Sequence, residues 1–200
     1  MGYDMKFKYK SLIVLFTVLN FLISASFVFA DDEGFQTTSG EMVKELTRTP
    51  VKYRSFVAKK RAIKVAQRIN NKMEEKTIVV VDNVDIPRLK LKIQFDYNSS
   101  ALKASSYALL QEVGKALMSS KLNDRHIMIN GHTDSDGAEQ YNLKLSFDRA
   151  DSVKAYLVSA FDIQEYRLQI RGYGELLPLE ENTSPYNKQI NRRVEFEIAN

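Results

Sequence analysis

A strand, a polar loop and a helix follow one another between residues 127 and 156, and this order restricts the fold more than any other feature. The strand is the apolar run at 127–129, which ends before Gly131. The loop runs from His132 to about Asn142 and is rich in Asp, Ser and Gly. Apolar residues then recur at close to 3.6-residue spacing, namely Leu145, Ala150, Val153 and Leu157. A strand followed by an amphipathic helix indicates a sheet that is covered by helices.

The same two patterns continue on both sides of this unit. Apolar and polar residues alternate at 89–95, as in a strand with one face toward a core. The other expected elements are helices at 101–119 and 142–159, strands at 126–130, 168–171 and 193–198, and a polar loop at 175–191. The order β-α-β-α-β-β predicts an α/β sandwich, a mixed sheet with two main helices on one face. The βαβ units imply parallel pairings, and the last strand, which follows a loop, is expected to be antiparallel.

The first thirty residues have the features of a signal peptide. Three lysines precede an almost wholly apolar run at 11–29, and Val28 with Ala30 fits a small-residue cleavage pattern. An uncleaved membrane anchor is the alternative, because the run approaches the ~20 residues that span a bilayer. Both interpretations place the rest of the chain outside the cytoplasm.

Composition excludes several classes of function. The 200 residues suffice for one ordinary domain with attachments. The chain has no cysteine, so disulfides, thiolate ligands, a thiol nucleophile and a lipid-modified cysteine are excluded. The net charge is +4, of which the three lysines and one aspartate of the first thirty residues supply +2. The remainder is too weakly basic to indicate a nucleic-acid partner.

Residues 31–84 are expected to form a tether ahead of a domain at 85–200. Thr38 and Glu41 have capping-box spacing, which predicts a short helix after a flexible start. Eight lysines and arginines lie between residues 52 and 72. Ala62, Val65, Ala66 and Ile69 share one helical face there, which predicts a basic amphipathic helix. Such a helix would contact anionic lipid or the acidic groups of a wall polymer, or would simply be a solvated surface.

Several short motifs resemble the peptidoglycan-binding domain that the OmpA, Pal and MotB proteins of bacterial envelopes share. The motifs occur in the order and at the spacing of that domain over more than half of the chain. They are Ile93–Asp96, Gly131–Asp134, Asn142–Ala150, Gly172–Glu175 with Pro178, and Asn191–Phe196. One departure is Asn187-Lys188, where these domains often have Gly-Arg.

The resemblance implies non-catalytic binding of meso-diaminopimelate in a stem peptide. Asp134 would take the ammonium group and Arg149 the carboxylate. The chemistry agrees, because a zwitterion needs an acceptor-only anion and a forked, permanently charged donor. The resemblance further implies that Phe95, Asp96, Asn142, Leu145 and Ser146 line or support the pocket.

Other interpretations of these residues are less well supported. Asp134 and Arg149 could form an ordinary ion pair. Asp134-x-Asp136-Gly137 is similar to half of a calcium loop, but the twelfth position is Leu145 rather than an acid. The only two histidines are six residues apart, which is a poor zinc site. No nucleophile elbow accompanies the serines. We therefore expect no metal and no cofactor.

We expect an exported protein of the periplasm, associated with the cell wall or outer membrane, that binds peptidoglycan and is not an enzyme. A metal-dependent wall hydrolase is one alternative. A lipid-binding accessory protein that acts through residues 52–72 is another. Arg192-Arg193 would support the pocket or protect a strand edge. The sequence leaves a homodimer open.

Overall fold

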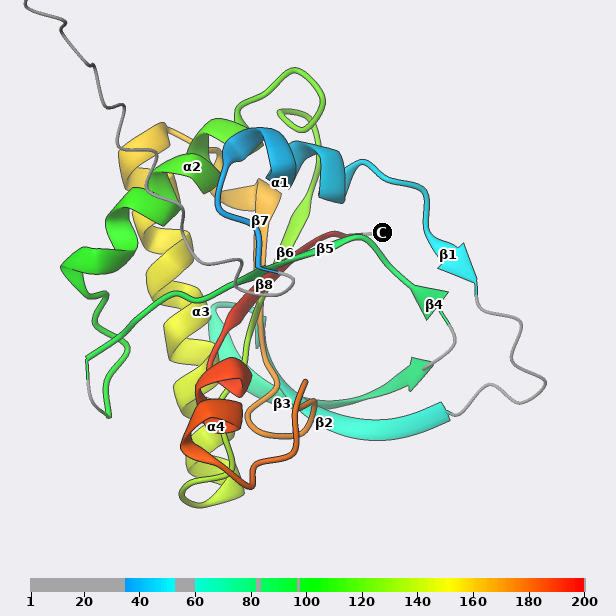
Figure 1. The fold of residues 1–200 in the computed structure, drawn as a ribbon, viewed down its shortest axis with the longest axis vertical. Helices are drawn as coiled ribbons and strands as arrows, with labels where there is room; N and C mark the ends of the chain where they lie inside the picture. The colour runs from blue at the N-terminus through cyan, green and yellow to red at the C-terminus, as the bar shows by residue number, and fades with distance from the viewer. Residues whose placement is uncertain (1–34, 53–59, 82–83, 97, 200) are drawn as a thin grey trace, which may run out of the picture. The chain divides into compact units, whose positions relative to one another are not determined.

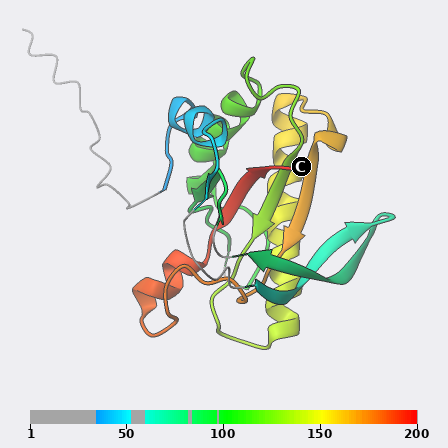
Figure 2. The same ribbon diagram turned by 90° about the vertical axis from the view of Figure 1, so that its right-hand side faces the viewer.

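The computed structural model describes residues 35–52, 60–81, 84–96 and 98–199, and Figures 1 and 2 show the ribbon from two sides. Residues 33–200 form one compact unit. The expected signal peptide at residues 1–30 lies outside the described residues. In the part of the chain that the structure describes, no helix is long and apolar enough to cross a membrane.

A six-stranded mixed sheet forms the centre of this unit, with the strand order β3-β2-β7-β6-β8-β5 (Figure 1). A separate two-stranded pair joins β1 to β4. The strands are β1 (Val51–Lys52), β2 (Lys60–Ile69), β3 (Lys72–Val81), β4 (Val84–Asp85), β5 (Arg88–Leu91), β6 (Ile127–Gly131), β7 (Leu168–Gly172) and β8 (Val194–Ile198).

Helices cover one face of this sheet. The helices are α1 (Ser39–Leu46), α2 (Tyr107–Leu117), α3 (Glu139–Phe161) and α4 (Pro185–Asn191), with 3₁₀ turns η1 (Ala104–Ser106) and η2 (Glu165–Arg167). α2 and α3 lie side by side, and α1 contacts α2 and β5 (Figure 1). The predicted arrangement of a mixed sheet with two main helices on one face is confirmed.

Most of the strand pairings agree with the predicted topology, but the parallel pairing expected for the two strands that α2 connects is not formed. β6 and β7 are parallel, as expected for two strands that α3 connects. β8 follows α4 and is antiparallel to both β6 and β5. It lies between them, so β5 and β6 point in the same direction without being neighbours.

Two glycines allow α3 to approach the ends of β6 and β7 closely. A Cβ atom on Gly131 would lie 2.0 Å from the carbonyl oxygen of Ser146. A Cβ atom on Gly172 would lie 2.6 Å from the backbone nitrogen of Phe147. Any side chain at either position would push the helix away from the sheet. The helix turn that carries Ser146 is thereby held at the end of the sheet where the pocket described below opens.

The basic segment forms a strand rather than the predicted helix. β2 pairs with β3 along its whole length as an antiparallel hairpin. Asn70 and Asn71 make the two-residue turn with φ angles of 49° and 61°, the left-handed values that such hairpins require. Ile63 and Val65 are β-branched and favour a strand. The β-branched run at 77–81 supplies the partner strand, so tertiary pairing outweighs the helical spacing.

Part of the loop predicted at 175–191 is helical. Ser184 caps α4, because its Oγ accepts the N–H of Asn187 at 3.1 Å. Pro185 occupies the first turn, where its missing N–H costs nothing. The Ser-Pro pair is the sequence signal for this helix. Smaller differences are that β5 ends at Leu91, α2 begins at Tyr107 and α3 begins at Glu139.

The short helix predicted from Thr38 and Glu41 is confirmed as α1, and both hydrogen bonds of the capping box are present. Met42 and Leu46 of this helix are 0% and 1% exposed and belong to the main core. Residues before 85 therefore contribute to the core. That residues 85–200 form a domain separate from residues 31–84 stays a prediction.

Candidate functional site

A pocket of about 690 Å³ opens where β6 leads into the loop after Gly131. It is lined by the segment after β5, the loop after β6, the first turns of α3, the end of α4 and the residues just before β8. The lining residues are Lys92, Ile93, Gln94, Phe95, Asp96, Asn98, Lys103, His132, Thr133, Asp134, Asp136, Gly137, Tyr141, Asn142, Leu145, Arg149, Gln189, Arg192 and Arg193. Charged and amide side chains predominate, so the pocket suits a polar ligand.

Asp134 lies in the loop after β6 and is 7% exposed. Its Oδ1 accepts the N–H of Asp136 at 3.0 Å, a local turn that orients the carboxylate. Its Oδ2 accepts a short, charge-assisted hydrogen bond from Nη1 of Arg192. The carboxylate is held from two sides, and each oxygen keeps a lone pair for a further donor.

Arg149 extends into the same pocket from the middle of α3. Its Nε donates to the carbonyl oxygen of Ser99 at 3.1 Å, and its Cζ lies 5.0 Å from the centroid of the Phe95 ring. Among the described residues, its terminal nitrogens Nη1 and Nη2 have no hydrogen-bond partner. Burial lowers the pKa of the guanidinium, Arg192 adds to this, and Tyr141 opposes it. An arginine nonetheless stays protonated at physiological pH.

Asp134 and Arg149 do not pair with each other. Among the residues that the structure describes, the ion pair of Asp134 is made with Arg192. The interpretation of Asp134 and Arg149 as an ordinary ion pair is therefore wrong. An anion and a cation face one pocket from two different elements, each held by contacts of its own.

The structure brings together six of the seven predicted site residues. Phe95, Asp96, Asn142 and Leu145 line the pocket with Asp134 and Arg149. Ser146 is 0% exposed and lies beneath it instead. Its Oγ donates to the carbonyl oxygen of Leu143 at 2.8 Å and accepts the N–H of Gly174 at 2.8 Å. Ser146 thus ties α3 to the turn after β7.

Asn142 connects three segments around the pocket. Its Nδ2 lies 3.2 Å from the carbonyl oxygen of Asp134 and 3.1 Å from that of Asp136. The same nitrogen lies 2.6 Å from Oε2 of Glu175. The first turn of α3 is thereby joined to the loops after β6 and β7. This amide fixes the backbone that presents Asp134.

Sequence reasoning did not separate Arg192 from Arg193, and the structure does. Both side chains contribute to the pocket lining, but Arg192 is the one that pairs with Asp134. Arg193 is 3% exposed, and its Nε donates to Oε1 of Glu195 at 2.7 Å. Arg192 is the C-terminal cap of α4 and Arg193 stands just before β8, so the different partners of the two side chains follow from how these elements pack. Lys188, at the position that departs from the related domains, pairs with Asp136 at 2.6 Å.

A buried group of charged and aromatic residues adjoins the pocket, and two of its members, His132 and Arg193, belong to the pocket lining. His132 is 2% exposed and stacks on Tyr173 with ring centroids 5.1 Å apart. Burial lowers the pKa of His132 to about 3, so its imidazole is neutral at neutral pH. Glu195 is 1% exposed and accepts hydrogen bonds from Arg193 and Arg88. Burial raises the pKa of Glu195, but the surrounding positive charges outweigh burial and hold it low.

The acidic loop shows no metal-binding geometry. Within the described ranges, no group of three His, Asp or Glu side chains is placed to hold a metal ion. Asp134 and Asp136, which suggested half of a calcium loop, are each engaged by a basic side chain. The loop thus presents its carboxylates to cationic groups.

Comparison with known proteins agrees with this arrangement. The sequence model of the OmpA family matches residues 94–192. Outer membrane porin F of Pseudomonas aeruginosa is 34% identical over 114 residues, which cover 57% of this chain and 32% of that protein. Outer membrane protein A of Bordetella avium is 39% identical over 137 residues, 68% of this chain and 66% of that protein. The chain thus spans about one third to two thirds of the length of these relatives.

Two solved structures are similar over part of the chain. The peptidoglycan-associated lipoprotein of Burkholderia pseudomallei is 29% identical with a TM-score of 0.48, covering 54% of this chain and 88% of that chain. The periplasmic domain of Helicobacter pylori MotB is 26% identical with a TM-score of 0.49, covering 56% and 83%. The family match contains Asp134, Arg149 and most of the other residues that line the pocket, and the C-terminal part of this chain is an OmpA-like domain.

Proposed function

We propose that this protein binds peptidoglycan non-covalently in the bacterial cell envelope, through the diaminopimelate of a stem peptide. One observation carries the proposal: Asp134 and Arg149 line one pocket from two elements and do not neutralise each other. The OmpA-like domain supports the same function. The outer-membrane names of the relatives fit a protein of the periplasm, cell wall or outer membrane.

The pocket chemistry fits the free end of diaminopimelate, which carries an ammonium and a carboxylate on one carbon. The terminal nitrogens of Arg149 would receive the carboxylate in a forked contact that lysine cannot make. Asp134 would accept hydrogen bonds from the ammonium. The ring of Phe95 lies under the guanidinium and restricts its orientation, which lowers the entropy cost of binding. No bond is made or broken.

The test is retention on purified peptidoglycan of the diaminopimelate type. Asp134→Ala and Arg149→Ala should each lower the affinity by at least about thirtyfold, because truncating one partner of a desolvated charge contact costs ~2 kcal/mol or more. Asp124→Ala and Arg125→Ala are matched controls, since both side chains are more than half exposed and neither lines the pocket. Circular dichroism checks that all four variants fold.

Peptidoglycan with lysine in place of diaminopimelate tests the ligand itself. Lysine lacks the second carboxylate, so the wild type should be retained on it no better than Arg149→Ala is retained on the diaminopimelate form. Equal retention of the wild type on both kinds of peptidoglycan would show that the pocket does not bind this carboxylate. Full retention of both alanine variants would contradict the site assignment.

A further inference from the structure

The outer edge of β3 has the features of an interaction surface. β3 is the last strand in the sheet order, so its backbone pairs with β2 on one side. In the part of the chain that the structure describes, no strand pairs with its other side. Such an edge presents N–H and C=O groups to any extended chain.

This edge changes character halfway along the strand. The first half carries four charged residues, Lys72, Glu74, Glu75 and Lys76. Charges of this kind protect an edge from pairing with another chain. The second half, Thr77 to Val81, reads Thr-Ile-Val-Val-Val, so it has no charge and every residue is β-branched. The charges that would discourage pairing with another chain are therefore missing only from the second half of the edge.

The unprotected half lies beyond the rest of the sheet. β7 pairs with β2 only at Ala66 and Gln67, and these are opposite Glu75 and Glu74 of β3. The segment 77–81 therefore belongs to the part of the hairpin that projects past β7, as the arrowhead of β3 shows in Figure 1. Val79 in this segment is 62% exposed.

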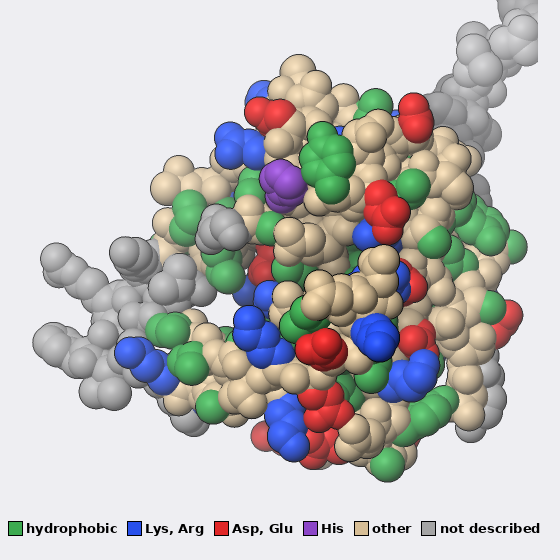
Figure 3. All heavy atoms as spheres, turned by 180° about the vertical axis from the view of Figure 1, so that it is seen from behind, with side chains coloured by type: hydrophobic (Ala, Val, Ile, Leu, Met, Phe, Trp, Pro, Cys, Tyr) green, Lys and Arg blue, Asp and Glu red, His purple; other side chains and the backbone are tan. Residues whose placement is uncertain are grey.

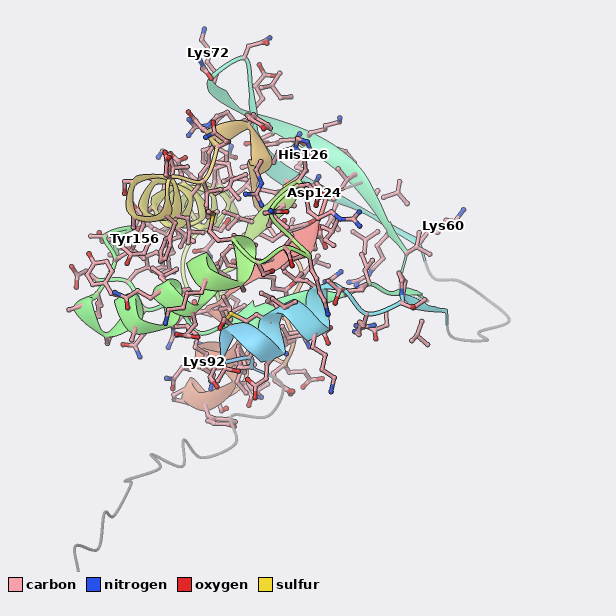
Figure 4. All side chains as sticks on the ribbon, turned by 90° about the horizontal axis from the view of Figure 1, so that it is seen from above. Lys60, Lys72, Lys92, Asp124, His126 and Tyr156 are labelled. Carbon is pink, nitrogen blue, oxygen red and sulfur yellow. The ribbon has the colours of Figure 1, made fainter. Side chains whose placement is uncertain are left out.

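Figure 1 shows the ends of β2 and β3 at Lys60 and Val81 extending away from the helices. Figure 4 labels Lys60 and Lys72 toward the two far ends of the hairpin. In Figure 3 the arm extends to the left, with hydrophobic and basic side chains interspersed along it. A partner strand could approach β3 along this arm without contacting the helices.

We propose that Thr77–Val81 pairs antiparallel with the same segment of a second copy of this chain, centred on Val79. This register places Val79 opposite Val79, Ile78 opposite Val80, and Thr77 opposite Val81. Cross-strand pairs of β-branched residues stabilise a sheet, and no like charges face each other within the segment.

Two-fold symmetry favours a second copy of this chain as the partner of the β3 edge. Antiparallel pairing about a two-fold axis closes after two chains, whereas a contact between different surfaces would propagate. The two hairpins would join their sheets edge to edge. Five residue pairs bury less than the ~1,200–2,000 Å² of a standard interface, so the dimer is weak, with a dissociation constant on the order of micromolar to millimolar.

Cysteine cross-linking tests the register, because the native chain has no cysteine. The protein is expressed from its full-length sequence and oxidised. Val79→Cys should form a disulfide-linked dimer, since residues paired across the axis lie about 5 Å apart at Cα. Thr77→Cys alone is the matched control, because each copy would lie about 13 Å from its counterpart and stay monomeric. A mixture of Thr77→Cys and Val81→Cys should cross-link.

Charge substitution tests the same contact without oxidation. Val79→Lys and Val79→Glu should each raise the dissociation constant by at least about tenfold in sedimentation experiments, because like charges then face each other. Mixing the two variants should restore the dimer. Met73→Lys, on the charged half of β3 and at a residue that is 39% exposed, should associate like the wild type. Thermal melts confirm that each variant is folded.

Three results would overturn the proposal. One is a wild type that stays monomeric at about 1 mM, because a dimer with a dissociation constant of ~1 mM or less would hold at least half of the chains at that concentration. A second is cross-linking of Thr77→Cys alone as efficiently as Val79→Cys. The third is a Val79→Lys and Val79→Glu mixture that stays monomeric while both variants are folded.

Discussion

At the scale of single residues, Arg192 is the side chain whose role the structure changes most. It pairs with Asp134, the carboxylate that we assign to the ligand ammonium. The ligand must therefore share or displace this guanidinium. Arg192→Ala should raise the affinity for a soluble diaminopimelate muropeptide by about three- to tenfold, because an internal competitor is removed. The N–H of Asp136 still orients the carboxylate.

Titration calorimetry measures this affinity, and a urea melt provides the control. The Arg192 side chain is 43% exposed, so its loss should cost no more than about 1 kcal/mol of stability. A fall in affinity as large as that of Arg149→Ala would instead show that Arg192 contacts the ligand directly.

His132 is the residue that should make folding sensitive to mild acid. Its pKa is lowered from 6.5 to about 3 by burial, so the unfolded chain takes up this proton first. Above the unfolded pKa of this histidine, both states hold it neutral and the free energy of unfolding is at its full value. As the pH falls below that pKa, the free energy of unfolding decreases by about 1.4 kcal/mol per pH unit. Urea melts between pH 6.5 and 4.5 should show this slope.

A His132→Gln variant isolates the effect. It should be less pH-dependent than the wild type, most clearly between pH 6.5 and about 5.5. Closer to pH 4.5, carboxylates with lowered pKa values, such as Glu195, add to the slope of both proteins, because the unfolded chain begins to protonate them. His126→Gln, at an exposed histidine, serves as the matched control and should keep the wild-type slope. An unchanged slope in His132→Gln would show that another group is responsible.

At the scale of elements, local patterns predict the structure well where one element buries one face. The period near 3.6 in α3 and the alternation at β8 are examples, and the capping box of α1 is present. The apolar residues of β2 recur at helical spacing, and this pattern predicts a helix instead of the β2–β3 hairpin. The two strands are stabilised by pairing with each other, which the spacing within one segment does not reveal. Asn70-Asn71, between two β-branched segments, is the signal that favours the hairpin.

Prediction of the site from the sequence is limited in the same way, because packing decides which side chains face the pocket. Motif order is sufficient to bring Asp134 and Arg149 to one pocket. Ser146 lies three positions before Arg149 on α3, yet it faces the sheet and not the pocket. Which side of a helix meets a sheet depends on packing, here on the glycines of β6 and β7. Spacing along the chain cannot supply that information.

At the scale of the whole molecule, α1 determines whether the OmpA-like domain is complete without the residues before it. Leu46 is 1% exposed and packs in the core that α2 and β5 share. Leu46→Ala should therefore destabilise the protein by about 2–5 kcal/mol, as expected for a buried leucine that leaves a cavity. Lys44→Ala, on the exposed side of the same helix, is the matched control and should change stability by less than about 0.5 kcal/mol.

Urea denaturation of both variants, together with a chain that begins at residue 85, distinguishes two possibilities. If α1 is part of the cooperative unit, the shortened chain and Leu46→Ala should both unfold at lower urea than the wild type. The shortened chain should be affected more, because it also loses Met42 and the β2–β3 hairpin. If instead Leu46→Ala costs less than about 0.5 kcal/mol, the burial of α1 adds little, and residues 85–200 fold independently of it.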